Sequence, residues 1–357
     1  MTASRSDPAR VSVIVPVYNS ADSLARCLGA IAASAHSPCE CIVVDVGSTD
    51  GSRAITKGFA VRLMELRGGP FGPAYARNRG AEVASGEILC FVDSDVVIRP
   101  DTLAEVAETF ARDPQPDAVF GSYDDTPAAS NFMSQYKNLF HHFIHQQASE
   151  EAGTFWAGCG AVRREVFFDM GGFNQDRYPR PSIEDIELGY RMRAVGLRIR
   201  LNKKIQVKHM KRWTVRGMMK SDIFDRAVPW TELILRDRRF INDLNLRRSS
   251  RFSVLIICGL PGALSASWWW AGWLAVSGAL IVALLMLNLP VYRFFLRKRG
   301  LQFTLQSIPW HWLYYFYSGL AFALGVARSL AQRRRTPGPS RSEPQVKWSD
   351  PARRPEG

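Results

Sequence analysis

The chain has 357 residues, enough for one large domain or two ordinary ones, and 46% of them are apolar, which excludes disorder as a description of the whole chain. Its six cysteines form no CxxC pair, which disfavours a disulfide scaffold and a cysteine-zinc module. The formal net charge of +13 favours phosphate-bearing partners, which include nucleotides, nucleic acids and anionic membrane surfaces.

Strand and helix patterns alternate through the first third of the chain. Strands are predicted at 11–17, 41–45, 61–66, 88–92 and 118–120, and helices at 20–31, 74–84 and 100–110. This alternation predicts an α/β domain with a mostly parallel sheet. Ligands bind beyond the carboxyl ends of such strands, so the turns that follow the first, second and fourth strands should converge on one edge of the sheet.

The alternation weakens past residue 125. Helices are predicted at 130–147 and 183–194, a loop and strand at 154–163, and two further strands at 198–201 and 205–209. Three histidines, at positions 141, 142 and 145, have helical spacing. No carboxylate shares their helix face, so we expect a solvated or lipid-adjacent surface there instead of a zinc site.

Charge separates the later part of the chain into two zones. Residues 191–251 hold eighteen Lys or Arg against five Asp or Glu, and residues 252–292 hold no charged side chain. A basic segment before an uncharged apolar run is typical of a membrane boundary. The expected parts are a disordered N-terminus at 1–10, an α/β domain at 11–215, basic membrane-proximal helices at 216–251, hydrophobic membrane segments at 252–330 (about 252–270, 271–291 and 308–328) and a disordered tail at 331–357.

The uncharged run is too long for one crossing, because a helix of that length would measure roughly 60 Å, about twice the hydrocarbon thickness. Two crossings joined near the tryptophans at 268–270 return the cationic residues at 293–299 to the side of Arg251. The number of crossings remains open, because Pro309 permits a surface-lying helix in place of a third one. The N-terminus lacks a signal peptide, so we expect the α/β domain in the cytoplasm, at the cell's inner membrane.

Two carboxylates flank a single residue where the fourth predicted strand ends. Asp93 and Asp95 in this position can hold a hard divalent cation that bridges the phosphates of a nucleotide. The structural alternative is a helix N-cap, since a helix is predicted shortly afterwards.

Four segments in order resemble the signatures of family 2 glycosyltransferases of the GT-A fold. They are VSVIVPVYNSADSLARCLGAI, IVVDVGSTDGS, GPAYARNRGAEVASGEILCFVDSDV and IEDIELGYRMRAVG, and the resemblance covers roughly residues 10–215. It implies a Rossmann-like GT-A domain that transfers a sugar from a nucleotide-sugar donor to an acceptor with inversion at the anomeric carbon.

The resemblance also implies roles for particular residues. The nucleotide-sugar would be bound by Pro16, Tyr18, Asn19, Asp45, Arg77 and Asp93. Val46 stands where the family often has a second aspartate, so the nucleoside base is left open.

On the acceptor side, Asp185 matches the general base of the family's ED motif, and Glu184 precedes it. Acidic residues in a first helical turn also suit the helix dipole, which is the structural alternative. Asp95 and His209 match the metal ligands, and the cation implied is Mg²⁺ or Mn²⁺.

The expected function is therefore a metal-dependent, inverting glycosyltransferase of the cell envelope whose acceptor is a lipid-linked or surface glycan at the membrane. One alternative is a processive polysaccharide synthase, although only Arg212-Trp213 remains of the Gln-x-x-Arg-Trp motif typical of those enzymes. Another is a non-catalytic, membrane-tethered protein that binds nucleotide-sugars or acts as a scaffold. Nucleic-acid binding is disfavoured, because the basic segment adjoins an apolar run and no groove-reading motif is present.

Overall fold

The computed structural model describes residues 10–36, 38, 40–68, 71–112, 116–242 and 244–335. Most of the expected disordered N-terminus, and the tail from residue 336 onward, lie outside these residues. The tail was expected to begin at residue 331, but the last helix continues to Arg335.

The described strands form one nine-stranded sheet in the order β3-β2-β1-β4-β8-β6-β9-β5, with β7 paired to β9. The strands are β1 (Val11–Val17), β2 (Glu40–Asp45), β3 (Arg62–Glu65), β4 (Ile88–Val92), β5 (Val96–Val97), β6 (Ala118–Tyr123), β7 (Glu151–Ala152), β8 (Cys159–Arg163) and β9 (Ile199–His209). The helices of this part are α1 (Ala21–Ala32), α2 (Ser52–Thr56), α3 (Pro73–Val83), α4 (Thr102–Arg112), α5 (Phe132–Gln147), α6 (Arg164–Asp169) and α7 (Glu184–Ala194).

The prediction of a mostly parallel sheet is only partly correct, because the sheet is mixed. Strands β3, β2, β1 and β4 are parallel, but β8 pairs antiparallel with both β4 and β6, and β5 and β7 pair antiparallel with β9. The periodicity of one strand reports burial and not its direction. The two strands predicted at 198–201 and 205–209 are a single strand, β9, whose register with β6 shifts between Phe120 and Ser122.

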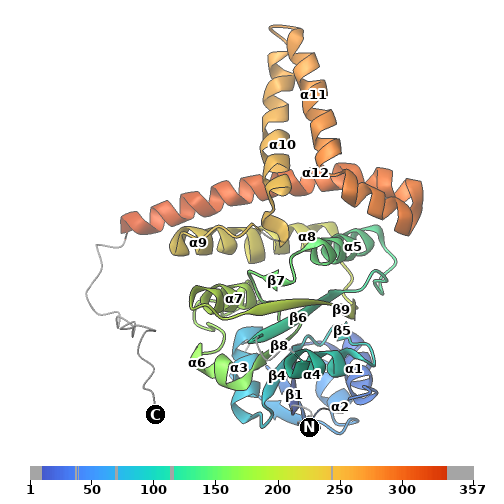
Figure 1. Cartoon of the computed structure of the whole chain (residues 1–357), viewed down its shortest axis with the longest axis vertical. Coiled ribbons are helices and arrows are strands. Elements are labelled where there is room, and N and C mark those ends of the chain that lie inside the picture. Colours follow the sequence, from blue (N-terminus) through green and yellow to red (C-terminus); the bar gives the residue numbers. More distant parts are fainter. Residues whose placement is uncertain are drawn as a thin grey trace, which may run out of the picture.

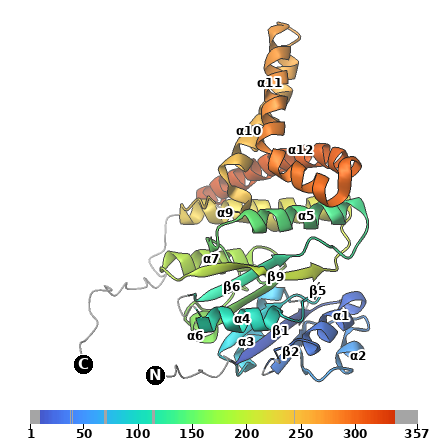
Figure 2. The same cartoon turned by 45° about the vertical axis from the view of Figure 1, so that its right-hand side comes forward.

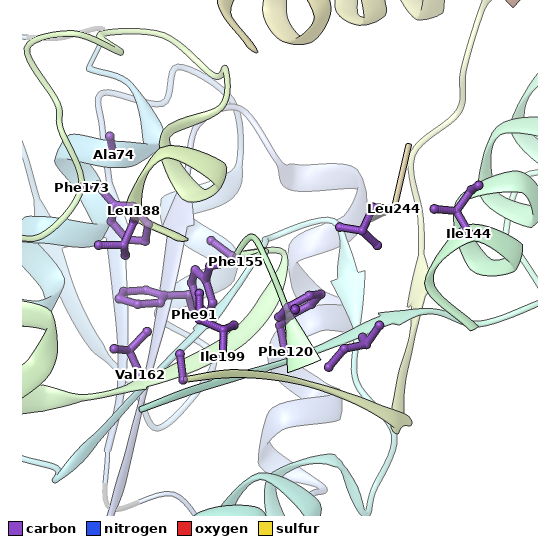
Figure 3. Packing of buried hydrophobic residues seen from close by; sticks show 14 of the residues in the cluster. Ala74, Phe91, Phe120, Ile144, Phe155, Val162, Phe173, Leu188, Ile199 and Leu244 are labelled. Carbon is purple, nitrogen blue, oxygen red and sulfur yellow. The ribbon is translucent and has the colours of Figure 1, made fainter. Parts of the chain in front are cut away.

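Helices cover both faces of the sheet because its strands alternate between two apolar clusters. Along β1, Val13 and Val15 contribute to one cluster and Ile14 to the other. Close approach of α3 to the sheet requires Gly80, since a Cβ there would lie 2.6 Å from a methyl group of Ile14. On the same face, Phe91 packs edge-on against Phe173 with ring centroids 5.1 Å apart (Figure 3).

A helical part lies above the α/β domain (Figure 1). It consists of α8 (Val215–Lys220), the π-helix η1 (Ser221–Ala227), α9 (Val228–Asp237), the 3-10 helix η2 (Leu244–Leu246), α10 (Arg248–Ala266), α11 (Gly272–Leu287) and α12 (Leu289–Arg335). Helices α10 and α11 form a hairpin that projects away from the sheet, and α12 runs across its base (Figures 1 and 2). The described part of α12 is kinked at Gly300, which has a φ of 79°.

Polar contacts join this helical part to the α/β domain through α5. The hydroxyl of Tyr136 lies 2.9 Å from Nδ1 of His311 on α12. Lys137, also on α5, is paired with Asp222 of η1. Because these groups are buried and hydrogen-bonded, they fix the orientation of the two parts.

By length and composition, the described residues include one helix able to cross a membrane, α10. Helix α11 meets this criterion only together with the stretch up to Ala331, and the two are bent by 59° at their junction. At the tip of the hairpin, Trp268, Trp269 and Trp270 are 90%, 81% and 66% exposed.

Candidate active site

The loops after β1 and β2 are held together by Asn19 and Asp45. Asn19 adopts a left-handed conformation with φ 48°, and its side-chain oxygen accepts a hydrogen bond of 2.8 Å from the backbone N–H of Thr49. Oδ1 of the buried Asp45 accepts hydrogen bonds from the backbone N–H of Ser48 at 3.0 Å and from Arg53 at 2.9 Å. These bonds outweigh the effect of burial, which opposes ionisation, and they hold the pKa of Asp45 below its usual value.

The second carboxylate oxygen of Asp45 is buried and has no hydrogen-bond partner among the described residues. Buried polar atoms of native proteins are normally satisfied, so a ligand N–H at this place would complete the site. Tyr18 lies half exposed at the rim, Pro16 lies in β1, and Val46 is part of the apolar core. Val46, which stands where the family often has a second aspartate, therefore packs in the core of the domain.

Arg77 of α3 pairs with two of the expected site residues at once. Its guanidinium lies 2.7 Å from Oδ1 of Asp93 and 2.9 Å from Oε1 of Glu184. Arg77 and Glu184 are both almost fully buried. The structure thus shows Arg77 and Glu184 as an internal ion pair that fixes Asp93 beside the start of α7.

Asp185, next to Glu184, is held by backbone donors. Its Oδ2 accepts from the N–H of Ala157 at 3.0 Å and its Oδ1 from the N–H of Ile186 at 2.8 Å. The N–H of Asp93 donates to the carbonyl of Gly158 at 3.2 Å, so one segment contacts both aspartates. Burial, and then the charge of Glu184, raise the pKa of Asp185 to about 6.

Asp95 faces His209, because β5 and β9 pair directly opposite each other at Val96 and His209. Oδ2 of Asp95 lies 3.4 Å from Nε2 of His209, and Nδ1 of His209 donates to the side-chain oxygen of Asn138 at 2.8 Å. With the Asn138 amide in this orientation, Nε2 presents a lone pair toward the carboxylate. Two acceptors that face each other are stabilised by a proton or a cation between them.

The pair Asp95 and His209 fits a divalent cation that is bound together with a nucleotide. Among the described residues, no three His, Cys, Asp or Glu side chains form a group that could hold a metal ion by themselves. A cation here would take its remaining ligands from diphosphate oxygens and water, as Mg²⁺ does when one or two protein groups bind it.

Sequence reasoning missed the aromatic residues that position His209. The ring of Tyr123 stacks on His209 with centroids 4.2 Å apart, and Trp156 packs edge-on against Tyr123 at 4.9 Å. Asn138 lies in the helix predicted at 130–147, and Tyr123 lies beyond the strand predicted at 118–120, but nothing in their local pattern indicated a partner more than 70 positions away.

The expectation of a surface for the histidines of α5 was wrong for two of them. His142 and His145 are buried, with Nδ1 atoms 2.7 Å from the carbonyl of Tyr123 and 3.2 Å from that of Gly121. They bind carbonyls of β6 because α5 packs on that strand. Arg79, which follows Arg77 on α3, pairs with Glu82 on the same helix.

Comparison with known proteins agrees with this arrangement. Residues 12–171 match the family described as Glycosyl transferase family 2. The Uncharacterized glycosyltransferase YibD of Escherichia coli (strain K12) is 37% identical over 107 residues, which cover 29% of this chain and 30% of that protein. Validoxylamine A glucosyltransferase of Streptomyces hygroscopicus subsp. jinggangensis (strain 5008) is 29% identical over 224 residues, 52% of each protein.

The chain thus spans about half the length, or less, of these curated relatives. Among solved structures, S. aureus TarS 1-349 in complex with UDP-GlcNAc shares the fold, with a TM-score of 0.50 and 20% identity over 64% of this chain and 66% of that chain. With its α/β sheet and ordered motifs, the chain thus contains a domain that matches glycosyl transferase family 2 over residues 12–171.

Proposed function

We propose that the protein is an inverting, metal-dependent glycosyltransferase that moves a sugar from a nucleotide-sugar donor to a membrane-associated acceptor, either lipid-linked or a surface glycan. The observation that carries this proposal is the convergence of Asp93, Asp95 and Asp185. They come from two distant parts of the chain: Arg77 and residues 157–158 hold Asp93 and Asp185 close together, and Asp95 lies two positions after Asp93. The match to the glycosyl transferase family over residues 12–171 supports the reaction class.

The donor would lie across the ends of β1, β2 and β4. Asp45 has a free buried acceptor for the nucleoside base, and Tyr18 and Asn19 border the same loop. Asp95 and His209 would hold Mg²⁺ or Mn²⁺, and the bound cation would neutralise negative charge on the diphosphate as it leaves. Asp93, fixed by Arg77, would contact the ribose and diphosphate.

Asp185 would take the proton of an acceptor hydroxyl. Direct displacement needs a base on the side opposite the leaving diphosphate, and a base works best when its pKa lies near the working pH. The pKa of about 6 meets this requirement, because Asp185 is mainly ionised at neutral pH yet more basic than a solvated aspartate. Two backbone N–H groups fix the carboxylate in place. Glu184 would act as a positioning residue through Arg77.

The membrane would hold the acceptor near this site. Helix α10 has 19 residues, about 28 Å at helical rise, which is close to the hydrocarbon thickness. The exposed tryptophans at its tip favour the far interface, and the cationic residues at its base favour the cytoplasmic leaflet. We place the catalytic domain on the cytoplasmic side of the cell's inner membrane, with α12 lying along the surface.

The test is nucleotide release from a panel of nucleotide-sugars by the detergent-solubilised chain with lipid extract, with and without Mn²⁺. We expect metal-dependent release from one donor, and its loss in Asp95→Ala. Asp101→Ala is the matched control, because Asp101 is an exposed carboxylate near the same strand end. Release of equal size by Asp95→Ala would contradict the metal site. Binding of the nucleotide-sugar without turnover would favour a scaffold, and long polymeric products would favour a processive synthase.

A further inference from the structure

The π-helix η1 connects the membrane-proximal helices to the active site. Asp222, in its first turn, pairs with Lys137 of α5 and accepts a hydrogen bond of 2.8 Å from the hydroxyl of Tyr317 on α12. These contacts are buried and tie η1 to two long helices. π-Helical turns are rare and occur frequently at functional sites.

The last turn of η1 borders the acceptor side of the site. The carbonyl of Asp225 accepts a hydrogen bond of 2.9 Å from the hydroxyl of Ser182, three positions before Asp185. The next residue, Arg226, lies four positions after Asp222, close to one π-helical turn, and therefore on nearly the same face of η1.

Arg226 is half-buried, and its guanidinium makes no hydrogen bond or ion pair with any residue that the structure describes. The carboxylate of Asp225 interacts electrostatically with this guanidinium but forms no direct ion pair with it, so the hydrogen-bonding edges of Arg226 stay open to a ligand. Arg226 interacts electrostatically with Tyr123 and His141. The rings of these two residues contact each other, and the ring of Tyr123 also stacks on His209. A partly desolvated cation without a partner is costly unless an anion binds it.

A second cation lies on the metal side of the same space. Met210 donates its N–H to the carbonyl of Asp95 at 2.8 Å, and Lys211 follows it. The ammonium of Lys211 lies 4.3 Å from the ring centroid of Trp213. Lys211 also interacts electrostatically with the carboxylate of Asp95, on the metal side of the site, and with that of Asp225, on the acceptor side.

An oxyanion with several acceptor oxygens suits these two cations, and a guanidinium is shaped to bind phosphate with two parallel hydrogen bonds. We propose that Arg226, assisted by Lys211, binds a phosphate group of the acceptor, so that the acceptor is a phosphate-bearing membrane lipid. The donor diphosphate belongs beside Asp95 and His209, whereas η1 contacts Ser182 and α12. This inference rests on the proposed function, and it specifies the acceptor class.

The transfer balances without any further reactant. The acceptor hydroxyl forms a bond to the anomeric carbon, the bond from that carbon to the diphosphate oxygen breaks, and its electron pair stays on the diphosphate. The proton of the hydroxyl passes to Asp185. The phosphate held by Arg226 is neither made nor broken in this step.

The test measures binding of dodecyl phosphate to the full chain in dodecyl maltoside micelles by titration calorimetry. We expect saturable binding that Arg226→Gln weakens about tenfold or more, since charge-assisted hydrogen bonds are roughly twice as strong as those between neutral groups. Lys211→Gln should weaken it less. The matched control is Arg216→Gln, because Arg216 is an exposed cation of the neighbouring helix α8. Thermal unfolding confirms that each variant is folded.

Two parallel titrations separate this inference from the proposed function. UDP and GDP, each with Mn²⁺, should bind wild type and Arg226→Gln equally. Absence of nucleotide binding by wild type would count against the proposed function while the dodecyl phosphate result still tests the anion site. Loss of nucleotide binding in Arg226→Gln with unchanged dodecyl phosphate binding would overturn the inference. So would equal affinity for inorganic phosphate and dodecyl phosphate, or an equal loss in Arg216→Gln.

Discussion

Replacing Arg77 with methionine tests whether the buried ion pair organises the site. The substitution keeps an unbranched chain of similar shape and removes the charge that lies 2.7 Å from Asp93 and 2.9 Å from Glu184. The Glu184 side chain is 5% exposed and retains one hydrogen bond, from the N–H of Ser182. Asp93 is 32% exposed and keeps part of its hydration, so most of the cost falls on Glu184.

Removing one partner of a buried pair costs about 3–5 kcal/mol, which lowers the melting temperature by on the order of 10 °C for a domain of this size. The assay is thermal unfolding of the full chain in detergent, followed by tryptophan fluorescence. Arg79→Met is the matched control, because Arg79 lies on the same helix and pairs with Glu82 at an exposed position. Its loss should be below about 1 kcal/mol.

The double variant Arg77→Met/Glu184→Gln, compared with the single variants in a double-mutant cycle, isolates the interaction between the two side chains. It removes the stranded carboxylate, so it should be more stable than Arg77→Met alone. The reasoning is refuted if Arg77→Met melts within 2 °C of wild type, or if the second substitution restores nothing.

Three further predictions concern the base, the cation and the membrane. Transfer to a hydroxyl acceptor should fall about tenfold per unit below pH 6, because only ionised Asp185 accepts the proton, and a flat pH–rate profile between pH 4.5 and 7 would contradict that role. Asn138→Ala leaves the buried Nδ1 of His209 without its partner, so it should weaken Mn²⁺ binding about 10–100-fold in nucleotide titrations and cost about 1–3 kcal/mol in stability; an unchanged metal requirement in the folded variant would argue against it. Serine in place of Trp268–Trp270 should reduce flotation with phosphatidylglycerol vesicles, whereas Phe240→Ser, an exposed aromatic outside the hairpin, should not; equal flotation of all three proteins would exclude insertion of the tip.

Much of the fold follows from local patterns. The predicted strand at 11–17 coincides with β1, and those at 41–45 and 88–92 agree with β2 and β4 within one residue. Short apolar runs rich in β-branched residues and followed by turn-forming residues are typical of buried strands. The candidate site was predicted for the same reason, since carboxylates that follow neighbouring parallel strands meet at one edge. The ordered motifs also indicated the family.

Other features depended on contacts between distant segments. Arg77 pairs with Glu184, 107 positions away, and nothing local in either helix specifies that partner. His209 reaches Asn138 only because α5 and β9 both lie against β6. The position of Arg226 depends on η1 being tied to α12 at one end and to Ser182 at the other.

The sequence by itself therefore determined which residues are buried, where strands and helices alternate, and which carboxylates follow the strands. These features depend on patterns of apolar and turn-forming residues only a few positions apart. Tertiary structure alone decided that β8 runs antiparallel, that α12 crosses the base of the hairpin, and which charge neutralises which. Charge pairing and strand direction are set by the packing of elements far apart in the chain, and a local pattern carries no record of that packing.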